Sequence, residues 1–291
     1  MKNRSDSELS RRRFLAGAAA GLAQVAVAPT LLGGLAHAAA PGVTPASLGE
    51  YVGGIHWHDI VPDRIALTFD DGPRPGRTTR VLDVLDEEKI KATFFICGRL
   101  VRRFPSILEE IDSAGHQLAN HTWSHPNLRH MSVREIEDQF DRTADAVNEA
   151  LQREVHLRYY RPPYGSPWYK RSKSAEKSRK KICEIIDRRG GLLCMWQVHS
   201  NDSHEGVTEA SIYKSMRMKF DRKKAGAMVF HDSSKMTARL LPEYLDFMRS
   251  YGLRFTTVDE LVTHKYGVAP EAVAQLPTAL RPARLAGLGV R

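Results

Sequence analysis

Short apolar runs alternate along the chain with longer segments in which apolar residues recur every three to four positions. The short runs predict buried strands, and the periodic segments predict helices that cover them. The predicted strands are residues 65–69, 92–97, 117–120, 157–160, 192–196, 227–230 and 254–257. The predicted helices are residues 78–89, 101–114, 132–151, 175–188, 208–223 and 242–251.

This alternation of strands and helices predicts an α/β fold with a parallel sheet, either a barrel or a doubly wound sheet. The length of 291 residues accommodates one large domain of this kind. In both architectures the active site gathers at the carboxyl ends of the strands. We therefore examine the polar residues that follow each predicted strand.

The first 38 residues have the character of an export signal. Arg11, Arg12 and Arg13 precede an Ala-, Gly- and Leu-rich stretch, which ends in Ala36-His37-Ala38 as a cleavage site. The paired arginines before Phe-Leu indicate the twin-arginine route. A membrane anchor is the alternative, but the glycines and a proline within the stretch make a poor spanning helix. We expect an exported protein, periplasmic or in the cell envelope, that starts near residue 39, with a lead-in over 39–63.

The net charge limits the classes of binding partner, and the cysteine content limits the disulfides that can form. The net charge is +9, of which residues 1–38 contribute +3, so the exported chain carries about +6. This charge suits an anionic surface such as a cell-wall polymer, or simply aids solubility. The chain lacks the motifs that would indicate nucleic acid. Three cysteines cannot form a disulfide framework, and we expect Cys97 to be buried and Cys183 and Cys194 to stay unpaired, although an oxidising compartment would permit that pair.

Basic residues concentrate in residues 169–181. A solvated loop and helix start is the favoured interpretation, and a polymer-binding patch is the alternative. The Ala- and Pro-rich tail over residues 266–291 shows little periodicity and is expected to be peripheral.

Chemically versatile residues follow several predicted strands. These groups are Asp70 with Asp71, residues 121–126, residues 161–165, residues 196–202, and His231 with Asp232. Asp70 and Asp71 end an apolar run before Gly72-Pro73, and a turn there brings both carboxylates to one edge of the sheet. Two adjacent carboxylates repel unless a cation or a shared proton relieves them. A solvated turn is the alternative for this pair alone.

His121 and His125 are four residues apart, so on a helical turn they share a face and can hold one metal ion. Such a pair on its own is often incidental. Two histidines and one aspartate, however, make a metal site that leaves positions open for water and substrate. One of the two adjacent aspartates can then bind the metal while the other acts as a base.

The motifs at these positions resemble those of the NodB-homology polysaccharide deacetylases, carbohydrate esterase family 4. The similarity spans residues 64–263, and we expect the domain over 64–265. The shared motifs are Thr68-Phe69-Asp70-Asp71-Gly72-Pro73, His121-Thr122-x-x-His125-Pro126, Arg161-Pro162-Pro163-Tyr164-Gly165, a divergent block over 196–202, and Met228-Val229-Phe230-His231. The resemblance implies a distorted (β/α)7 barrel as the fold. It also implies an enzyme that removes acetyl groups from a polysaccharide by hydrolysis.

The resemblance also implies a metal centre and a base. Asp71, His121 and His125 would hold one divalent metal, Zn²⁺ above all, with Co²⁺, Ni²⁺ or Mn²⁺ as alternatives. Asp70 would be the general base, and Arg161 would pair with it and orient it.

The other implied roles concern the leaving group and the oxyanion. His231 would be the general acid, because an amine leaves badly unless it is protonated, and Asp202 would be its charge partner. The backbone N–H of Tyr164 would contribute to the oxyanion hole.

The chain departs from the family pattern in three ways. Ser203 follows Asp202 where the family has a tryptophan, so the aromatic wall would be lost or supplied by Trp168 or Trp123. His199 stands where an aspartate is common, and it competes with Asp202 as the partner of the acid. The segment between Gly165 and Cys194 is longer than usual and includes the basic stretch, so we expect it to influence substrate choice.

We therefore expect an exported, metal-dependent deacetylase that removes N-acetyl groups from a glycan containing N-acetylglucosamine, such as peptidoglycan, poly-N-acetylglucosamine or chitin-type oligomers. The alternatives are an O-acetyl esterase acting on xylan or another acetylated glycan, and a carbohydrate-binding module without catalysis. The expected partner is the acetylated polysaccharide, with neither nucleic acid nor a membrane span after removal of the signal. The sequence leaves the oligomeric state open.

Overall fold

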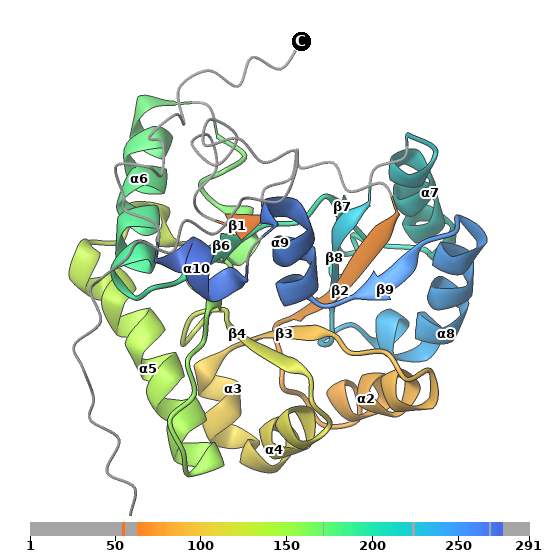
Figure 1. The fold of residues 1–291 in the computed structure, drawn as a ribbon, viewed down its shortest axis with the longest axis horizontal. Coiled ribbons are helices and arrows are strands. Elements are labelled where there is room, and N and C mark those ends of the chain that lie inside the picture. The colour runs from red at the N-terminus through yellow and green to blue at the C-terminus, as the bar shows by residue number, and fades with distance from the viewer. Residues whose placement is uncertain (1–53, 56–62, 171, 223–224, 268, 276–291) are drawn as a thin grey trace, which may run out of the picture. The chain divides into compact units, whose positions relative to one another are not determined.

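Parallel strands form one curled sheet, surrounded by helices, in the computed structural model (Figure 1). The structure describes residues 54–55, 63–170, 172–222, 225–267 and 269–275. The expected export signal, most of the lead-in and the end of the tail lie outside these residues. The described strands are β1 (Gly54–Ile55), β2 (Arg64–Asp70), β3 (Thr93–Ile96), β4 (Gln117–Asn120), β5 (Tyr159–Tyr160), β6 (Leu192–Cys194), β7 (Val198–His199), β8 (Gly226–His231) and β9 (Arg254–Thr256).

The strand order is β1-β6-β5-β4-β3-β2-β8-β7, and every pair is parallel. Strand β2 pairs with β8 along one edge, while its other edge is shared by β3 and β9. No pair joins β1 to β7 among the described residues, so the barrel stays open there. This arrangement confirms the predicted fold class, a distorted (β/α)7 barrel.

The described α-helices connect the strands and cover the sheet. They are α2 (Thr78–Glu87), α3 (Gly98–Arg103), α4 (Pro105–Ser113), α5 (Val133–Leu151), α6 (Lys173–Arg188), α7 (Glu209–Phe220), α8 (Lys235–Ser250), α9 (Val258–Tyr266) and α10 (Pro270–Ala274). Two short 3₁₀-helices, η1 (Leu128–His130) and η2 (Pro163–Gly165), lie in the connections after β4 and β5. Within the described part of the chain, no helix combines the length and apolarity needed to cross a membrane.

Strand β2 shows how the pattern of side chains builds two cores. Ile65, Leu67 and Phe69 point outward into the larger apolar core beneath the covering helices. Ala66 points inward into a second apolar core, to which side chains of α9 and α10 contribute. Figure 1 shows both helices against the middle of the sheet. Thr68 and Asp70 share this inward face, so polar groups replace apolar ones towards the carboxyl end of the strand.

Two predicted helices differ from the structure because of prolines. The helix predicted over 101–114 is two helices, α3 and α4, which meet at Phe104 with φ −136° and ψ 57°. Pro105 has no N–H and disfavours the helical conformation at the preceding residue. Conversely, Pro242 does not begin its helix: it lies inside α8, which starts after Ser234, whose hydroxyl accepts a hydrogen bond from Thr237 N–H.

Four described strands and α-helices were not predicted, and neither were the two short 3₁₀-helices. Helix α9 follows the last predicted strand, in a stretch for which no helix was predicted. Strands β1 and β7 have two residues each, too few to produce an apolar pattern. Helix α10 lies in the tail that we expected to be peripheral, and it buries Val273 in the inner core. The described start of the tail therefore belongs to the packed structure.

A stability test follows from the outer core. The ring of Phe94 is buried between Phe69, with ring centroids 5.1 Å apart, and His116. We expect Phe94→Ala to lower the free energy of unfolding by about 3–5 kcal/mol, measured by urea titration, because it leaves a cavity. The control Met218→Ala, at an exposed position, should change it by no more than about 0.5 kcal/mol. A loss at Phe94 as small as that of the control would contradict this description of the core.

Candidate active site

The residues singled out in the sequence meet around one cleft at the carboxyl ends of the strands. The cleft has a volume of about 630 Å³. Its lining includes both adjacent aspartates, His121, His125 and His231. Their convergence from β2, β4 and β8 follows from the rule that the carboxyl ends of parallel strands share one edge of the sheet.

Asp70 and Asp71 separate at the end of β2. Asp70 is the last residue of the strand and is buried inside the barrel. Asp71 has a φ of 78°, a left-handed conformation that is uncommon for a residue with a side chain. We expected Gly72 and Pro73 to break the alternation of the strand, but the break already occurs at Asp71. It brings the second carboxylate to the same cleft as the first.

Asp71, His121 and His125 form a group that can hold a metal ion. Their ligand atoms all lie within 4.8 Å of one another. The Oδ1 of Asp71 is 3.1 Å from Nε2 of His125 and 3.6 Å from Nε2 of His121. Burial by itself would raise the pKa of Asp71, but the two imidazoles hold it well below its usual range, so the carboxylate is ionised.

The donor set fits a divalent metal. Nδ1 of His121 lies 2.7 Å from the carbonyl oxygen of Arg161, and a proton donated there leaves Nε2 free to coordinate. Two imidazole nitrogens and one carboxylate are a common ligand set for zinc, with positions left open.

The two histidines do not lie on the helical turn that was considered from their spacing. Residues 121–125 form a loop in which Thr122 and His125 both have left-handed φ values, 71° and 60°. Asn120 Oδ1 accepts a hydrogen bond from Thr122 N–H, and Thr122 Oγ1 accepts one from His125 N–H. These local bonds bring the rings to a centroid separation of 5.0 Å without a helix.

Arg161 is fully buried and lies beside Asp70. Its Nη1 donates to Asp70 Oδ1 at 2.6 Å and to Thr68 Oγ1 at 2.8 Å, and its Nε donates to the carbonyl oxygen of Cys194 at 2.8 Å. The guanidinium also lies over the ring of Phe95, 3.8 Å from its centroid. The expected pairing of Arg161 with Asp70 therefore has the geometry of a short, charge-assisted hydrogen bond.

His231, at the end of β8, is bound to Asp202. Its Nδ1 lies 2.7 Å from Asp202 Oδ1, and its backbone N–H donates to Oδ2 at 2.9 Å. Burial alone would lower the pKa of His231, but Asp202, together with Asp70 and Asp71, raises it to about 9. The ring is therefore a cation at neutral pH, with Nε2 directed away from Asp202.

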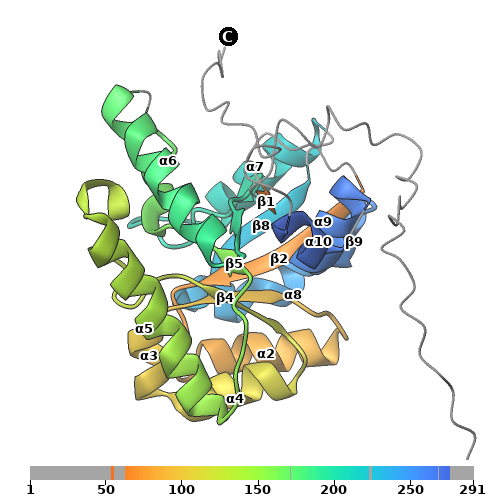
Figure 2. The ribbon, with the colours of Figure 1, turned by 60° about the vertical axis from the view of Figure 1, so that its left-hand side comes forward.

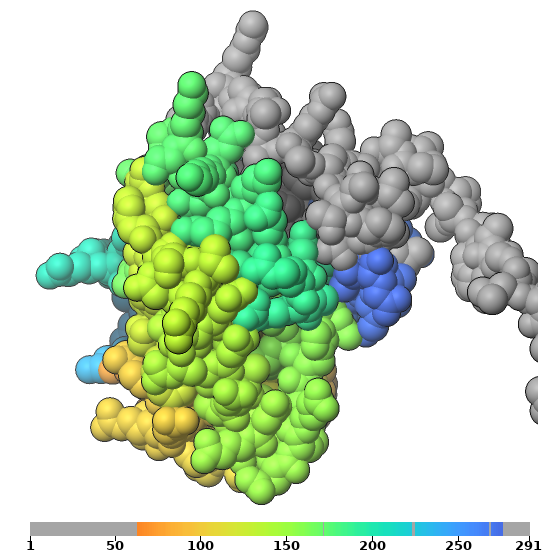
Figure 3. Space-filling model, turned by 90° about the vertical axis from the view of Figure 1, so that its left-hand side faces the viewer, coloured from red at the N-terminus to blue at the C-terminus, as the bar shows by residue number. Residues whose placement is uncertain are grey.

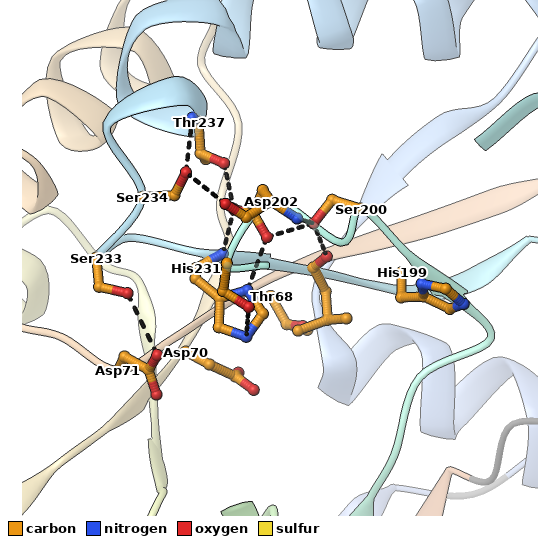
Figure 4. A network of polar contacts seen from close by, with 12 residues as sticks. Thr68, Asp70, Asp71, His199, Ser200, Asp202, His231, Ser233, Ser234 and Thr237 are labelled. Carbon is orange, nitrogen blue, oxygen red and sulfur yellow. Dashed lines mark hydrogen bonds and ion pairs between the residues drawn. The ribbon is translucent and has the colours of Figure 1, made fainter. Parts of the chain in front are cut away.

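Figure 4 shows the Asp202 carboxylate among hydroxyl groups, with His199 lying apart from it. Ser200 Oγ donates to Oδ1 at 2.5 Å, and Thr237 Oγ1 donates to Oδ2. Asp202, and not His199, is thus the partner of His231. His199 instead lines the cleft, and burial lowers its pKa.

The aromatic wall of the cleft differs from our expectation. Trp168 and Trp123 are buried and do not line the cleft; Tyr164, Tyr169 and Trp196 line it instead. Gly165, with φ +60°, allows this arrangement, because a Cβ there would lie 2.4 Å from the ring of Tyr169 and 2.8 Å from that of Trp196. The aromatic lining of the cleft thus comes from these three residues.

The sequence analysis named two further site residues without giving either a role. Thr68 binds Arg161, and the period of two along β2, which places it on the face of Asp70, was the available signal. Asp232 is buried beneath Gly72, and burial raises its pKa to about 7. Thr78 Oγ1 donates to its Oδ2 at 2.6 Å, a contact over 154 residues that no local pattern indicates.

The cysteines play no disulfide role here. Cys97, Cys183 and Cys194 form no disulfide. Cys194 lies on β6, and its Sγ is 3.6 Å from Nη2 of Arg161, so it contributes to the surroundings of the buried guanidinium.

Comparisons with known proteins agree with this geometry. Residues 60–181 match the polysaccharide deacetylase family. The chain is 32% identical over 212 residues to the peptidoglycan-N-acetylglucosamine deacetylase PgdA of Listeria monocytogenes, a match covering 72% of this chain and 41% of that protein. The chain thus spans less than half the length of this curated relative.

Two solved structures share the fold. The peptidoglycan deacetylase PdaC from Bacillus subtilis is 28% identical, with a TM-score of 0.55, and the match covers 70% of this chain and 91% of that one. The Xyl-CE4 domain of a multidomain xylanase from the hindgut metagenome of Trinervitermes trinervoides is also 28% identical, with a TM-score of 0.57 and coverage of 72% and 94%.

A distorted (β/α)7 barrel with aspartates and histidines gathered at its carboxyl edge defines the NodB-type class of proteins. Since the sequence motifs, the family match and the structural neighbours agree, the chain belongs to the polysaccharide deacetylase family, carbohydrate esterase family 4.

The metal site can be tested by titration. We expect His125→Ala to weaken Zn²⁺ binding, measured by calorimetry, by more than the roughly 10- to 100-fold that loss of a ligand's hydrogen-bond partner costs. His130→Ala, an exposed histidine on η1, is the matched control and should bind zinc like the wild type. Equal affinity in the two variants would remove His125 from the metal site.

The pairing of His231 with Asp202 can be tested by NMR titration of the metal-free protein. The His231 ring should titrate near pH 9, and in Asp202→Asn its pKa should fall to about 6.5 or below, while His199 keeps its pKa. Since the folded-state pKa lies above the unfolded value, the stabilisation from protonated His231 is complete below about pH 6.5 and is lost as the pH rises through about 9. An unchanged His231 titration in Asp202→Asn would disprove the pairing.

Proposed function

We propose that this protein is an exported, metal-dependent deacetylase that hydrolyses N-acetyl groups of a glycan containing N-acetylglucosamine. The single observation that carries the proposal is the position of Asp70 and His231. They are paired neighbours on the adjacent strands β2 and β8, and both line the cleft of the metal-binding group. A base and an acid around one such group are what amide hydrolysis needs.

Asp70 is the proposed general base. Arg161 binds its Oδ1 at 2.6 Å, which keeps the carboxylate oriented, while Oδ2 lies 3.8 Å from Nε2 of His121. The free oxygen is therefore directed towards the group formed by Asp71, His121 and His125. In this position Asp70 accepts the proton of a water molecule that attacks the acetyl carbonyl carbon.

The three ligands would hold a divalent metal, with zinc best suited to two imidazoles and one carboxylate. When bound, such an ion polarises a carbonyl group and lowers the pKa of water. The chain itself would supply the remaining stabilisation of the oxyanion through the N–H of Tyr164. This residue has a φ of 60°, and its ring lies edge-on to His125 with centroids 4.6 Å apart.

His231 is the proposed general acid. Asp202 holds the ring through Nδ1, so the proton on Nε2 is available to the leaving amine. An amine leaves poorly without a proton, whereas the alcohol of an ester leaves more easily. A histidine kept cationic at neutral pH therefore favours an amide substrate over an ester.

The candidate substrates are peptidoglycan, poly-N-acetylglucosamine and chitin-type oligomers. Support comes from the similarity to PgdA of Listeria monocytogenes, a peptidoglycan-N-acetylglucosamine deacetylase. O-acetyl hydrolysis on xylan remains the second candidate, since a similar structure belongs to a xylanase. A binding module without catalysis is less favoured, because no member of the proposed base, acid and ligand set is missing. The twin-arginine signal expected over 1–38 supports export.

The base assignment gives a sharp test. Asp70→Asn should reduce acetate release by roughly 10²- to 10⁴-fold, the contribution of a positioned base, while zinc stays bound. His125→Ala should lose both activity and zinc. The measurement is acetate release from peptidoglycan, N-acetylglucosamine oligomers of both linkages and acetylxylan, with and without chelator.

The outcomes separate the candidates. Release from acetylxylan alone would replace the amide proposal with the esterase. No release from any substrate by the zinc-loaded protein would leave the binding module, and near-full activity of Asp70→Asn would disprove the base.

A further inference from the structure

The structure divides the basic residues of the 169–181 segment into two groups with different surroundings. Arg179 and Lys181 are bound to backbone carbonyl groups. Lys170, Lys173, Lys177 and Lys180 have exposed side chains. We call this second group the lysine ridge. The sequence alone gave no means of telling the two groups apart.

The first group attaches α6 to the wall of the cleft. Arg179 Nη1 donates to the carbonyl oxygen of Lys170 at 2.7 Å and to that of Pro167 at 3.4 Å. These carbonyls flank Tyr169, whose ring lines the cleft. Lys181 donates to the carbonyl oxygen of Met131, at the end of η1. The lysine ridge therefore starts next to the cleft. The hydrogen bonds that hold it there are donated by Arg179 and Lys181, which are not part of the ridge.

From Lys170, just before α6, the ridge continues along one face of the helix. Lys173, Lys177 and Lys180 are spaced by four and three residues, which aligns them over about 10 Å of helix. This helix packs beside α5 at the edge of the fold (Figure 2). Residues of the green segment that includes α6 form part of the surface in the space-filling view (Figure 3).

Little negative charge compensates the ridge. Lys180 has Glu184 at 3.9 Å, whereas Lys173 and Lys177 have no carboxylate within ion-pair distance in the described part of the chain. Lys173 lies in the first turn of α6, where the positive end of the helix dipole disfavours a cation.

We infer that the lysine ridge binds carboxylate groups of the glycan strand whose acetyl group occupies the cleft. The ridge would contact the strand beyond the cleft and favour an anionic glycan, such as peptidoglycan with free stem-peptide carboxylates, over a neutral one. This inference rests on the proposed deacetylase function. Exposed ion pairs are individually weak and screened by salt, so the ridge would act through several pairs together.

The test compares two triple variants of the full chain. Lys173→Gln, Lys177→Gln and Lys180→Gln are combined in one. Lys89→Gln, Lys91→Gln and Lys214→Gln are combined in the control, which removes the same charge from exposed lysines elsewhere. The substrates are peptidoglycan fragments with free carboxylates and the same fragments after carboxyl amidation. The measured quantity is the ratio of kcat/KM for the free-carboxylate substrate to that for the amidated one.

We expect this ratio to fall about tenfold in the ridge variant, since three exposed pairs contribute together. The control should keep the wild-type ratio. The fall should also shrink between low salt and 0.5 M salt, because screening removes the same interaction. An unchanged ratio in the ridge variant, or an equal fall in the control, would overturn the inference.

A binding measurement distinguishes a failure of the inference about the lysine ridge from a failure of the proposed function. Co-sedimentation with insoluble peptidoglycan, before and after amidation, measures the ridge without any turnover. If the zinc-loaded protein releases no acetate but the ridge variant alone loses carboxylate-dependent binding, the ridge stands and the enzymatic function falls. If turnover is intact and binding is the same in all three proteins, the ridge falls and the function stands.

Discussion

A cation enclosed in a protein must find its partners there, and the centre of this barrel is organised around one such cation, Arg161. Removing a guanidinium from water is costly unless hydrogen bonds and an opposite charge replace the water. Here β2 supplies Thr68 and Asp70, β6 supplies the carbonyl of Cys194, and β3 supplies the face of Phe95. The contacts of Arg161 therefore link β2, β3 and β6 and orient Asp70 at the same time.

The fold was predictable from the sequence because buried parallel strands are nearly continuous apolar runs. The predicted bounds of β2, β4 and β8 were close to those observed. The alternation with helices predicted a parallel sheet, either a barrel or a doubly wound sheet, and the family resemblance pointed to the barrel. The errors came from Pro105 and Pro242, since a proline marks a break in one helix and is tolerated within another. Strands β1 and β7 were missed because their pairing depends on contacts across the sheet.

Only those site residues that directly follow a strand could be placed from the sequence. The positions of Asp70, His121, Arg161 and His231 followed from the rule for parallel sheets and from family motifs. The left-handed backbone of Asp71 is a property of the folded turn and leaves no trace in an apolar pattern. The hydroxyls around Asp202 and the aromatic wall come from distant segments, so tertiary contacts had to be seen before they could be assigned.

The pairing of Asp70 with His231 in neighbouring strands has an implication for how such proteins diversify. The separation of the two groups is fixed by the hydrogen-bond ladder between β2 and β8, and a shift of one residue would turn His231 to the opposite face. Tyr169, in the connection between β5 and α6, and His199, at the end of β7, lie outside this ladder. An insertion in the connection before α6 can reshape the cleft without altering the distance between the proposed base and the proposed acid. The groups proposed for chemistry and the surface available for recognition therefore lie in separate parts of the barrel.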